Sequence, residues 1–215
     1  MSPDPARPLR AVVIDSGIDA MHPGVRGRGT VVAGPSFSAA GPDDPHGGAR
    51  DHLGHGTAVA AVILHCVQPV ELVALRIFDR DATCAFDAVL HALRHAVELG
   101  PHVINLSLGT TSLRHRAALH EVLTLAKNRG VRITAPASYG GLACDPGSLP
   151  GVEAVVGDPN VLPMLPELRP HGGRLLWFAS PLPPPDADGV RRLLARGDSL
   201  AVAAVTGCLL RQLRR

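Results

Sequence analysis

The stretch Arg10-Ala11-Val12-Val13-Ile14-Asp15-Ser16-Gly17 decides the fold class. Its apolar run shows no polar alternation, which predicts a strand from Arg10 to Ile14 that is buried on both faces. Asp15 then stands at the carboxyl end of that strand, and Ser16-Gly17 lets the chain turn sharply. Strands covered on both faces belong to parallel sheets that carry helices above and below. The stretch therefore predicts an α/β fold whose first strand ends in a carboxylate.

Apolar runs alternate with helix-like segments along the rest of the chain, which is typical of a doubly wound parallel sheet. The helices are expected at 56–66, 87–99, 114–128 and 199–213, and the further strands at 72–77, 103–108, 131–135, 152–156 and 174–178. We interpret the proline-rich region 159–185 as loops packed on the same domain around the last of these strands. The resulting order, β-α-β-α-β-α-β, predicts a three-layer fold with a mainly parallel central sheet flanked by helices.

The composition indicates one domain with an aliphatic core. The chain has 215 residues, of which 46% are hydrophobic but only 3% are aromatic, so Ala, Val, Leu and Ile must fill the interior. Residues 1–10 are polar and proline-rich, and we expect them to form an N-terminal extension to a domain over 11–215.

Charge and cysteine usage narrow the class of partner. The net charge of +2 comes without a long basic run or interleaved aromatic and basic residues, so nucleic acid is not an expected partner. No apolar stretch reaches the roughly 20 residues that a membrane span requires. The four cysteines form no C-x-x-C pair, which favours free thiols, and no signal-peptide h-region precedes Ala11. We therefore expect a cytoplasmic protein, and the sequence carries no signal of its oligomeric state.

Three reactive side chains lie where an α/β sheet presents its chemistry. Asp15 ends the first strand, His55 stands between glycines at the start of a predicted helix, and Ser199 opens the last helix. Ligands bind outside the carboxyl ends of the strands in such sheets, and a helix N-terminus favours developing negative charge. Taken singly, Asp15 is equally well explained as a turn or cap residue, and Ser199 is better explained as a helix N-cap than as a nucleophile.

Other site chemistries find little support. Asp51, His52 and His55 could be read as a metal site, but the two histidines lack the i, i+4 spacing of helical zinc ligands and no third ligand follows in a recognisable pattern. The chain has no G-x-S-x-G elbow, P-loop or G-x-G-x-x-G fingerprint. We therefore expect neither a metal nor a nucleotide cofactor.

The order Asp, His, Ser along the chain is that of subtilisin-like enzymes. The chain resembles subtilisin-like serine proteases of the S8 family in segments that cover most of it from Ala11 to Gly207. Those segments are Val12-Val13-Ile14-Asp15-Ser16-Gly17-Ile18, His55-Gly56-Thr57 with Val59-Ala60, Val103-Ile104-Asn105-Leu106-Ser107-Leu108-Gly109, Pro146-Gly147, Pro150 with Val152, Val155-Val156-Gly157, and Gly197-Asp198-Ser199-Leu200-Ala201, where the family has Gly-Thr-Ser-Met-Ala.

The resemblance implies a serine endopeptidase that acts on a peptide or protein substrate. Asp15, His55 and Ser199 take the places of the catalytic triad. The resemblance further implies that the substrate pairs with Ser107, Leu108 and Gly109, and that the first specificity pocket is lined by Ala135, Pro136 and Ala137. Small residues there leave room for an apolar or medium-sized side chain.

The departures from the family pattern support a second hypothesis. Tyr139, with Ser138 beside it, stands where the family places the Asn of its oxyanion hole, and Ala203-Ala204 replaces the usual Pro-His pair. The missing Asn favours a catalytically weak or inactive protease-like module that binds peptides. The Ala203-Ala204 replacement is interpreted as a packing change, and the presence of all three triad residue types favours the active enzyme. A third hypothesis, a subtype of the first, is a narrow enzyme that processes peptides inside the cell.

The segment after the histidine helix predicts that calcium does not stabilise the protein. The family's calcium loop normally follows that helix, but His65 to Glu71 is short and offers few of the hard oxygen ligands that calcium requires. We expect EDTA to leave the thermal unfolding midpoint unchanged. A fall of several degrees that calcium reverses would show a site in this chain that its sequence does not reveal.

Overall fold

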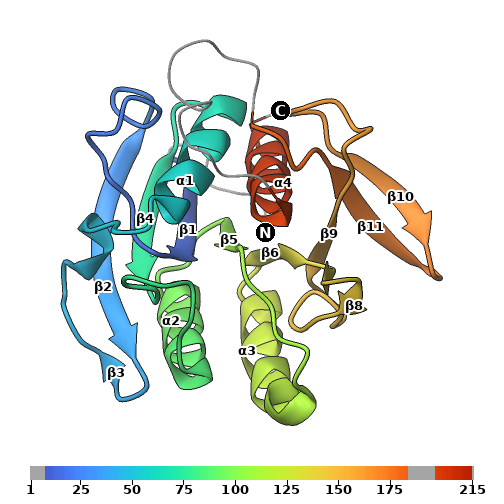
Figure 1. The fold of residues 1–215 in the computed structure, drawn as a ribbon, viewed down its shortest axis with the longest axis horizontal. Helices are drawn as coiled ribbons and strands as arrows, with labels where there is room; N and C mark the ends of the chain where they lie inside the picture. The colour runs from blue at the N-terminus through green and yellow to red at the C-terminus, as the bar shows by residue number, and fades with distance from the viewer. Residues whose placement is uncertain (1–7, 184–196, 215) are drawn as a thin grey trace.

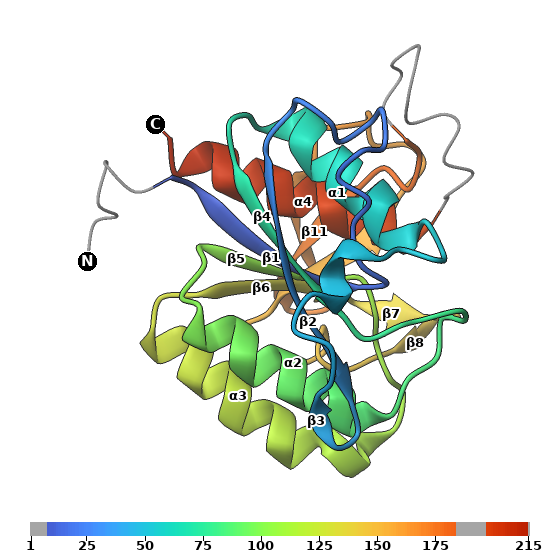
Figure 2. The same cartoon turned by 90° about the vertical axis from the view of Figure 1, so that its left-hand side faces the viewer.

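The computed structural model describes residues 8–183 and 197–214 and has three layers (Figure 1). A twisted sheet forms the middle layer. Helices α1 (His55–Cys66) and α4 (Asp198–Gln212) cover one face, and α2 (Phe86–Glu98) and α3 (Arg116–Asn128) cover the other, as the second view shows (Figure 2). The predicted α/β fold with its flanking helices is confirmed.

Within the described residues, the main sheet has nine strands in the order β10-β11-β9-β6-β5-β1-β4-β2-β3. Its interior pairs are parallel, whereas β2–β3 and β10–β11 are antiparallel. The strands are β1 (Arg10–Asp15), β2 (Thr30–Ser38), β3 (Gly41–Pro42), β4 (Glu71–Arg76), β5 (Val103–Leu106), β6 (Arg132–Pro136), β9 (Glu153–Gly157), β10 (Glu167–His171) and β11 (Arg174–Ala179). A separate hairpin joins β7 (Ser138–Tyr139) to β8 (Leu142–Ala143).

Strand β1 occupies the point where the chain changes direction across the sheet. It pairs with β4 on one side and β5 on the other. Val13 belongs to the core beneath α1 and α4, while Val12 and Ile14 belong to the core beneath α2 and α3. A strand with apolar residues on both faces can be satisfied only by two helical layers. At this switch in strand order the sheet opens a crevice at its carboxyl edge.

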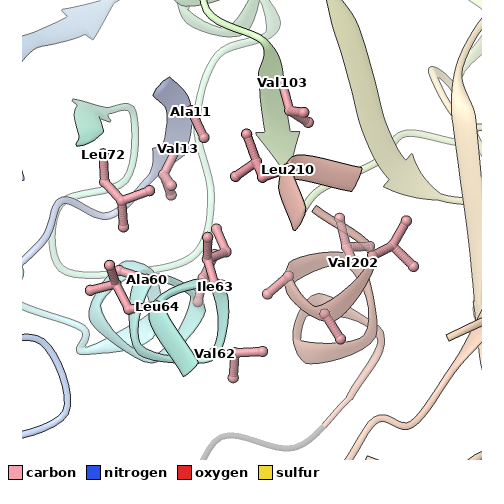
Figure 3. Packing of buried hydrophobic residues seen from close by; sticks show 14 of the residues in the cluster. Ala11, Val13, Ala60, Val62, Ile63, Leu64, Leu72, Val103, Val202 and Leu210 are labelled. Carbon is pink, nitrogen blue, oxygen red and sulfur yellow. The ribbon is translucent and has the colours of Figure 1, made fainter. Parts of the chain in front are cut away.

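Helices α1 and α4 are buried almost all round. Every residue of α1 from Gly56 to Leu64 is buried, as is every residue of α4 from Leu200 to Leu210, because each helix packs on the sheet and on the other. Figure 3 shows their aliphatic side chains meeting those of the strands. At Gly207 the two helices approach so closely that a Cβ would lie 2.4 Å from Cys66 Cβ.

Two sheet edges were not predicted correctly. Strand β2 was not predicted, because its apolar run is broken by Gly34-Pro35 and its place beside β4 depends on long-range pairing. The region 159–185 was interpreted as loops around one short strand, which is wrong in part, because Glu167–His171 forms β10 and pairs with β11. Charged and exposed residues in β10 hide the strand pattern, and Pro170 is tolerated because β10 lies at the edge of the sheet.

In the described part of the chain, none of the helices is both long and apolar enough to cross a membrane. The four cysteines, all of which are described, are free.

The contact between α1 and α4 generates a stability prediction. Replacing a helix-interior glycine with alanine usually gains about 0.5–1 kcal/mol, but at Gly207 the new methyl group would overlap Cys66, and overpacking costs about 1–3 kcal/mol. We expect Gly207→Ala to lower the free energy of unfolding measured with denaturant. In a Cys66→Gly background the same substitution should cost less, and equal costs in both backgrounds would contradict the assigned contact.

Candidate active site

A cleft of about 520 Å³ opens at the carboxyl edge of the sheet, beside the end of β1. Segments that follow β5 and β6 contribute to its lining, as do the first turns of α1 and α4. The residues that line it are Leu53, His55, Phe78, Ala82, Ser107, Leu108, Gly109, Pro136, Ser138, Tyr139, Gly197, Asp198 and Ser199. The cleft thus collects side chains from both halves of the sequence.

Asp15 and His55 form the charged pair predicted from the sequence. His55 Nδ1 lies 2.7 Å from Asp15 Oδ1, and the Asp15 side chain is 1% exposed whereas that of His55 is 35% exposed. The backbone N–H of Ser16 also donates to Asp15 Oδ1, at 2.7 Å. A buried carboxylate that accepts the Nδ1 proton fixes the imidazole tautomer and leaves Nε2 available toward the cleft.

Glycine at two positions lets this pair meet. Gly17 turns the chain after β1 with φ of 103°, and a Cβ there would lie 2.2 Å from Arg50 O. Gly54 precedes α1 in the left-handed conformation, with φ of 74°. These turns bring the start of α1 against the end of β1, which places His55 over Asp15.

Asp51 holds the N-terminus of α1, a role that sequence reasoning did not assign. Its Oδ1 accepts the backbone N–H of Gly54 at 2.7 Å, and its Oδ2 accepts that of Thr57 at 2.8 Å and the Thr57 hydroxyl. The Ser16 hydroxyl lies 2.8 Å from Asp51 Oδ1 and accepts the N–H of Gly56. Asp51 therefore caps the helix that carries His55.

Two carboxylates set the electrostatics of His55. Burial alone would lower the pKa of its imidazole, but the hydrogen bond and charge of Asp15, together with the charge of Asp51, hold that pKa above its usual value of 6.5. A raised pKa makes the neutral imidazole a stronger proton acceptor, which suits a group that must accept and return a proton.

Ser199 lies in the first turn of α4 and faces the same cleft as His55. The turn is tied to the sheet by Gly197 N–H, which donates to Pro181 O at 3.1 Å. The Ser199 hydroxyl donates to Ser107 O at 3.5 Å. The hydrogen bonds of the described residues include none between Ser199 and His55.

A buried polar network fixes α4 against β5 and β6. The Thr206 hydroxyl donates to Asn105 Oδ1 at 2.9 Å and lies 2.7 Å from that of Thr134, while Asn105 Nδ2 donates to Ser107 Oγ at 2.9 Å. Asn105 belongs to one of the family segments, but no role was predicted for it from the sequence, and none was predicted for Thr206 or Thr134. A polar residue inside an apolar run is the signal that could have found them.

The residues proposed for substrate binding and the oxyanion hole are placed as follows. Ser107, Leu108, Gly109 and Pro136 line the cleft, as do Ser138 and Tyr139, whereas Ala135 is fully buried and Ala137 does not reach the lining. Tyr139 lies on the β7–β8 hairpin and is 72% exposed. Pro136 is therefore the member of the proposed Ala135–Ala137 pocket that contacts the cleft.

The residues considered as a metal site serve other purposes. Asp51 caps α1, His55 pairs with Asp15, and His52 Nδ1 lies 2.9 Å from Asp79 Oδ1. No group of three or more His, Cys, Asp or Glu side chains suited to a metal occurs among the described residues.

A family model for the subtilase family, Peptidase S8, matches residues 12–139, a range that includes Asp15, His55 and the Ser107 segment. The chain belongs to the subtilase family. This subtilase is 30% identical over 141 residues to the thermostable alkaline protease of Halalkalibacterium halodurans, covering 61% of this chain and 36% of that protein. It is 32% identical over 142 residues to subtilisin BL of Lederbergia lenta, covering 62% of this chain and 48% of that protein. The chain thus spans less than half the length of both relatives.

Solved structures share the fold of this subtilase. The nisin leader peptidase NisP from Lactococcus lactis matches with a TM-score of 0.69 and 17% identity over 97% of this chain and 78% of that one. A cold-adapted subtilisin-like serine proteinase matches with a TM-score of 0.68 and 19% identity over 96% of this chain and 75% of that one. The predicted subtilisin-like fold is confirmed.

The Asp15–His55 pair generates a prediction for the His55 pKa. In Asp15→Asn the imidazole keeps its burial but loses its neighbouring charge, so its pKa should fall below that of the wild-type protein when followed by NMR titration. Because a raised histidine pKa stabilises the fold at low pH and loses that effect as pH rises through it, the stability lost in Asp15→Asn should be greatest at acidic pH. Asp79→Asn, beside His52, is the matched control and should leave His55 unchanged.

Proposed function

We propose that this subtilase is a serine endopeptidase whose triad is Asp15, His55 and Ser199. The observation that carries the proposal is the hydrogen bond between buried Asp15 and His55 at a cleft that also holds Ser199 on a helix N-terminus. A nucleophile, a base and an orienting carboxylate are the components of acyl transfer. The family membership of the chain supports the same reaction class.

In the proposed mechanism, His55 Nε2 takes the proton of Ser199 as its oxygen attacks a peptide carbonyl. The buried Asp15 carboxylate stabilises the imidazolium that forms, and the raised pKa of His55 reflects that stabilisation. The imidazolium then gives its proton to the leaving amine. Water hydrolyses the acyl-enzyme by the same proton transfers in reverse order.

Charge on the carbonyl oxygen would be stabilised first by the backbone N–H of Ser199. The first N–H groups of a helix have no partner within the helix, and the helix dipole favours negative charge there. A second donor would come from Tyr139 or Ser138, which line the same cleft. The loss of one such donor costs about 10²–10³ in rate, a magnitude measured in a subtilisin.

The substrate would bind as an added strand along Ser107–Gly109. This segment continues β5 beyond its last paired residues and lines the cleft. An extended peptide laid there would gain backbone hydrogen bonds independent of its side chains. Such binding presents a carbonyl to Ser199 for either a protein or a short peptide.

A second candidate function is a peptide-binding module with little or no catalysis. Two observations favour it: the contact of Ser199 Oγ is with Ser107 O at 3.5 Å, and the residue at the family's oxyanion Asn is an exposed tyrosine. The labelling experiment below separates it from the first candidate.

We also propose that the protein acts on peptides in the cytoplasm. The four free cysteines support this location, because thiols persist in reducing compartments. Fractionation of cells that produce the full-length protein tests it, and recovery outside the cytoplasm would contradict it.

Labelling of the nucleophile tests the proposed function. A fluorophosphonate should modify Ser199, and Ser199→Ala or His55→Ala should abolish both labelling and peptide turnover, because the serine is unreactive without its base. Peptide mapping of the label is essential. A label on Ser107 or Ser138, with full activity in Ser199→Ala, would contradict the triad.

The oxyanion region generates a second kinetic prediction. Tyr139 is exposed, and a phenol is longer than the carboxamide it replaces, so we expect Tyr139→Phe to be nearly silent in kcat/KM and Tyr139→Asn to raise it. If the Tyr139 hydroxyl is a donor, Tyr139→Phe should instead lose about 1.5–3 kcal/mol of transition-state stabilisation. Ser138→Ala is the companion variant, and an unchanged kcat/KM in all three would place the oxyanion hole elsewhere.

A further inference from the structure

Asp198 is a charged residue of the cleft that the proposed mechanism does not use. It precedes Ser199 in the first turn of α4, where the resembling family motif has threonine. Among the residues that line the cleft it is the one carboxylate, and no Lys or Arg is present in that lining, which consists entirely of described residues. Its backbone position is set by the same turn that positions the nucleophile.

The Asp198 carboxyl is held against the backbone of Gly157, the last residue of β9. The backbone N–H of Gly157 donates to it, and a Cβ at Gly157 would lie 2.1 Å from Asp198 Oδ1. Burial, then the charges of Asp145 and Asp198, raise the pKa of the Cys144 thiol to about 11. By contrast, the charges that act on His55 are those of Asp15 and Asp51.

Cys144 packs between two of the segments that line the cleft. The Cys144 thiol is buried 3.3 Å from Pro136 O, and a Cβ at Gly109 would lie 2.5 Å from Cys144 Sγ. Pro136 and Gly109 both line the cleft. Asp198 therefore shares the cleft with Gly109 and Pro136, which belong to the segments proposed to contact a substrate.

No cationic side chain in the described part of the chain neutralises Asp198. The residue is exposed and lines the cleft, and partial burial raises the pKa of its carboxyl while the Gly157 N–H lowers it. A carboxylate that loses hydration without gaining a cation is held at a cost in free energy. A ligand that supplies the cation would recover that cost.

We propose that Asp198 binds a cationic side chain of the substrate, so that the cleft selects peptides with Arg or Lys in the segment bounded by Gly109, Pro136 and Asp198. The inference rests on the proposed function only in that the cleft must bind peptide. Arginine suits the position best, because its planar group can donate two hydrogen bonds to one carboxylate. Lysine would supply the charge with less directional contact.

Direct binding tests this assignment without requiring catalysis. The full chain carrying Ser199→Ala is titrated in a calorimeter with acetyl-Ala-Ala-Arg-Ala-Ala-amide and with the same peptide containing citrulline, which keeps the shape of arginine but not its charge. We expect the arginine peptide to bind about ten- to a hundredfold more tightly, the range for a hydrogen bond to a charged group.

Two carboxylate variants distinguish a direct contact between Asp198 and the substrate cation from a general effect of negative charge near the cleft. Asp198→Asn keeps an oxygen for the Gly157 N–H and should bind both peptides equally, with an unchanged unfolding midpoint. Asp81→Asn removes an exposed charge beside Ala82 at the rim of the cleft and should preserve the preference. A purely structural role for Asp198 would move stability but not the arginine-to-citrulline ratio.

Several results would overturn the assignment. These are equal binding of the two peptides, no measurable binding of either at its solubility limit, a preference that survives Asp198→Asn, or an equal loss of preference in Asp81→Asn. Fluorophosphonate labelling of the wild-type protein is run in parallel. Labelled Ser199 without an arginine preference rejects this inference alone, whereas an arginine preference without labelling rejects the proposed catalysis and supports the role of Asp198.

Discussion

The close packing of α1 against α4 is the constraint on which the site depends. His55 and Ser199 come from opposite halves of the chain, and each lies in the first turn of one of these helices. Their separation is set where the helices touch, at Gly207 and Cys66, and where both rest on the same face of the sheet. Small residues permit that approach, since a larger side chain would hold the helices apart. The small residues of the core therefore help to set the distance between His55 and Ser199 in the cleft.

Buried polar groups then convert this packing into a defined geometry. Aliphatic contacts tolerate small sliding, but a hydrogen bond in a dry interior fixes position and angle. Asn105 and Thr206 lock α4 to the strands beneath it, while Ser16 and Asp51 lock the start of α1 to the end of β1. One set of hydrogen bonds thus positions the helix that carries Ser199, and a separate set positions the helix that carries His55. The Asp15–His55 hydrogen bond lies between them and is protected from solvent on the Asp15 side.

Two of the departures from the family pattern lie in the cleft. Tyr139 and Asp198 both line it, while the Asp15–His55 side keeps the family residues. The residues proposed to move a proton and the Ser107–Gly109 segment are thus retained, whereas the residue at the family's oxyanion position and the residue before Ser199 have changed. This division is the pattern expected if the chemistry is kept and the choice of substrate is altered, because specificity resides in contacts outside the reacting groups.

The sequence alone predicted the elements that depend on neighbouring residues, but not those that depend on contacts between distant parts of the chain. The strand at Arg10–Asp15, the helix after His55 and the helix that begins near Ser199 were predicted because each is encoded by its own apolar pattern and turn residues. The family segments also indicated which three residues belong together. Strand β2 and the β10–β11 hairpin were not predicted correctly, since their pairing is stabilised by distant strands rather than by local periodicity. Only the tertiary structure decided that Asp51 caps the helix of His55, that Ala135 is buried while Pro136 reaches the cleft, and that Asp198 lines the cleft. The physical reason is that a side chain's direction and solvation depend on neighbours that the chain brings together only on folding.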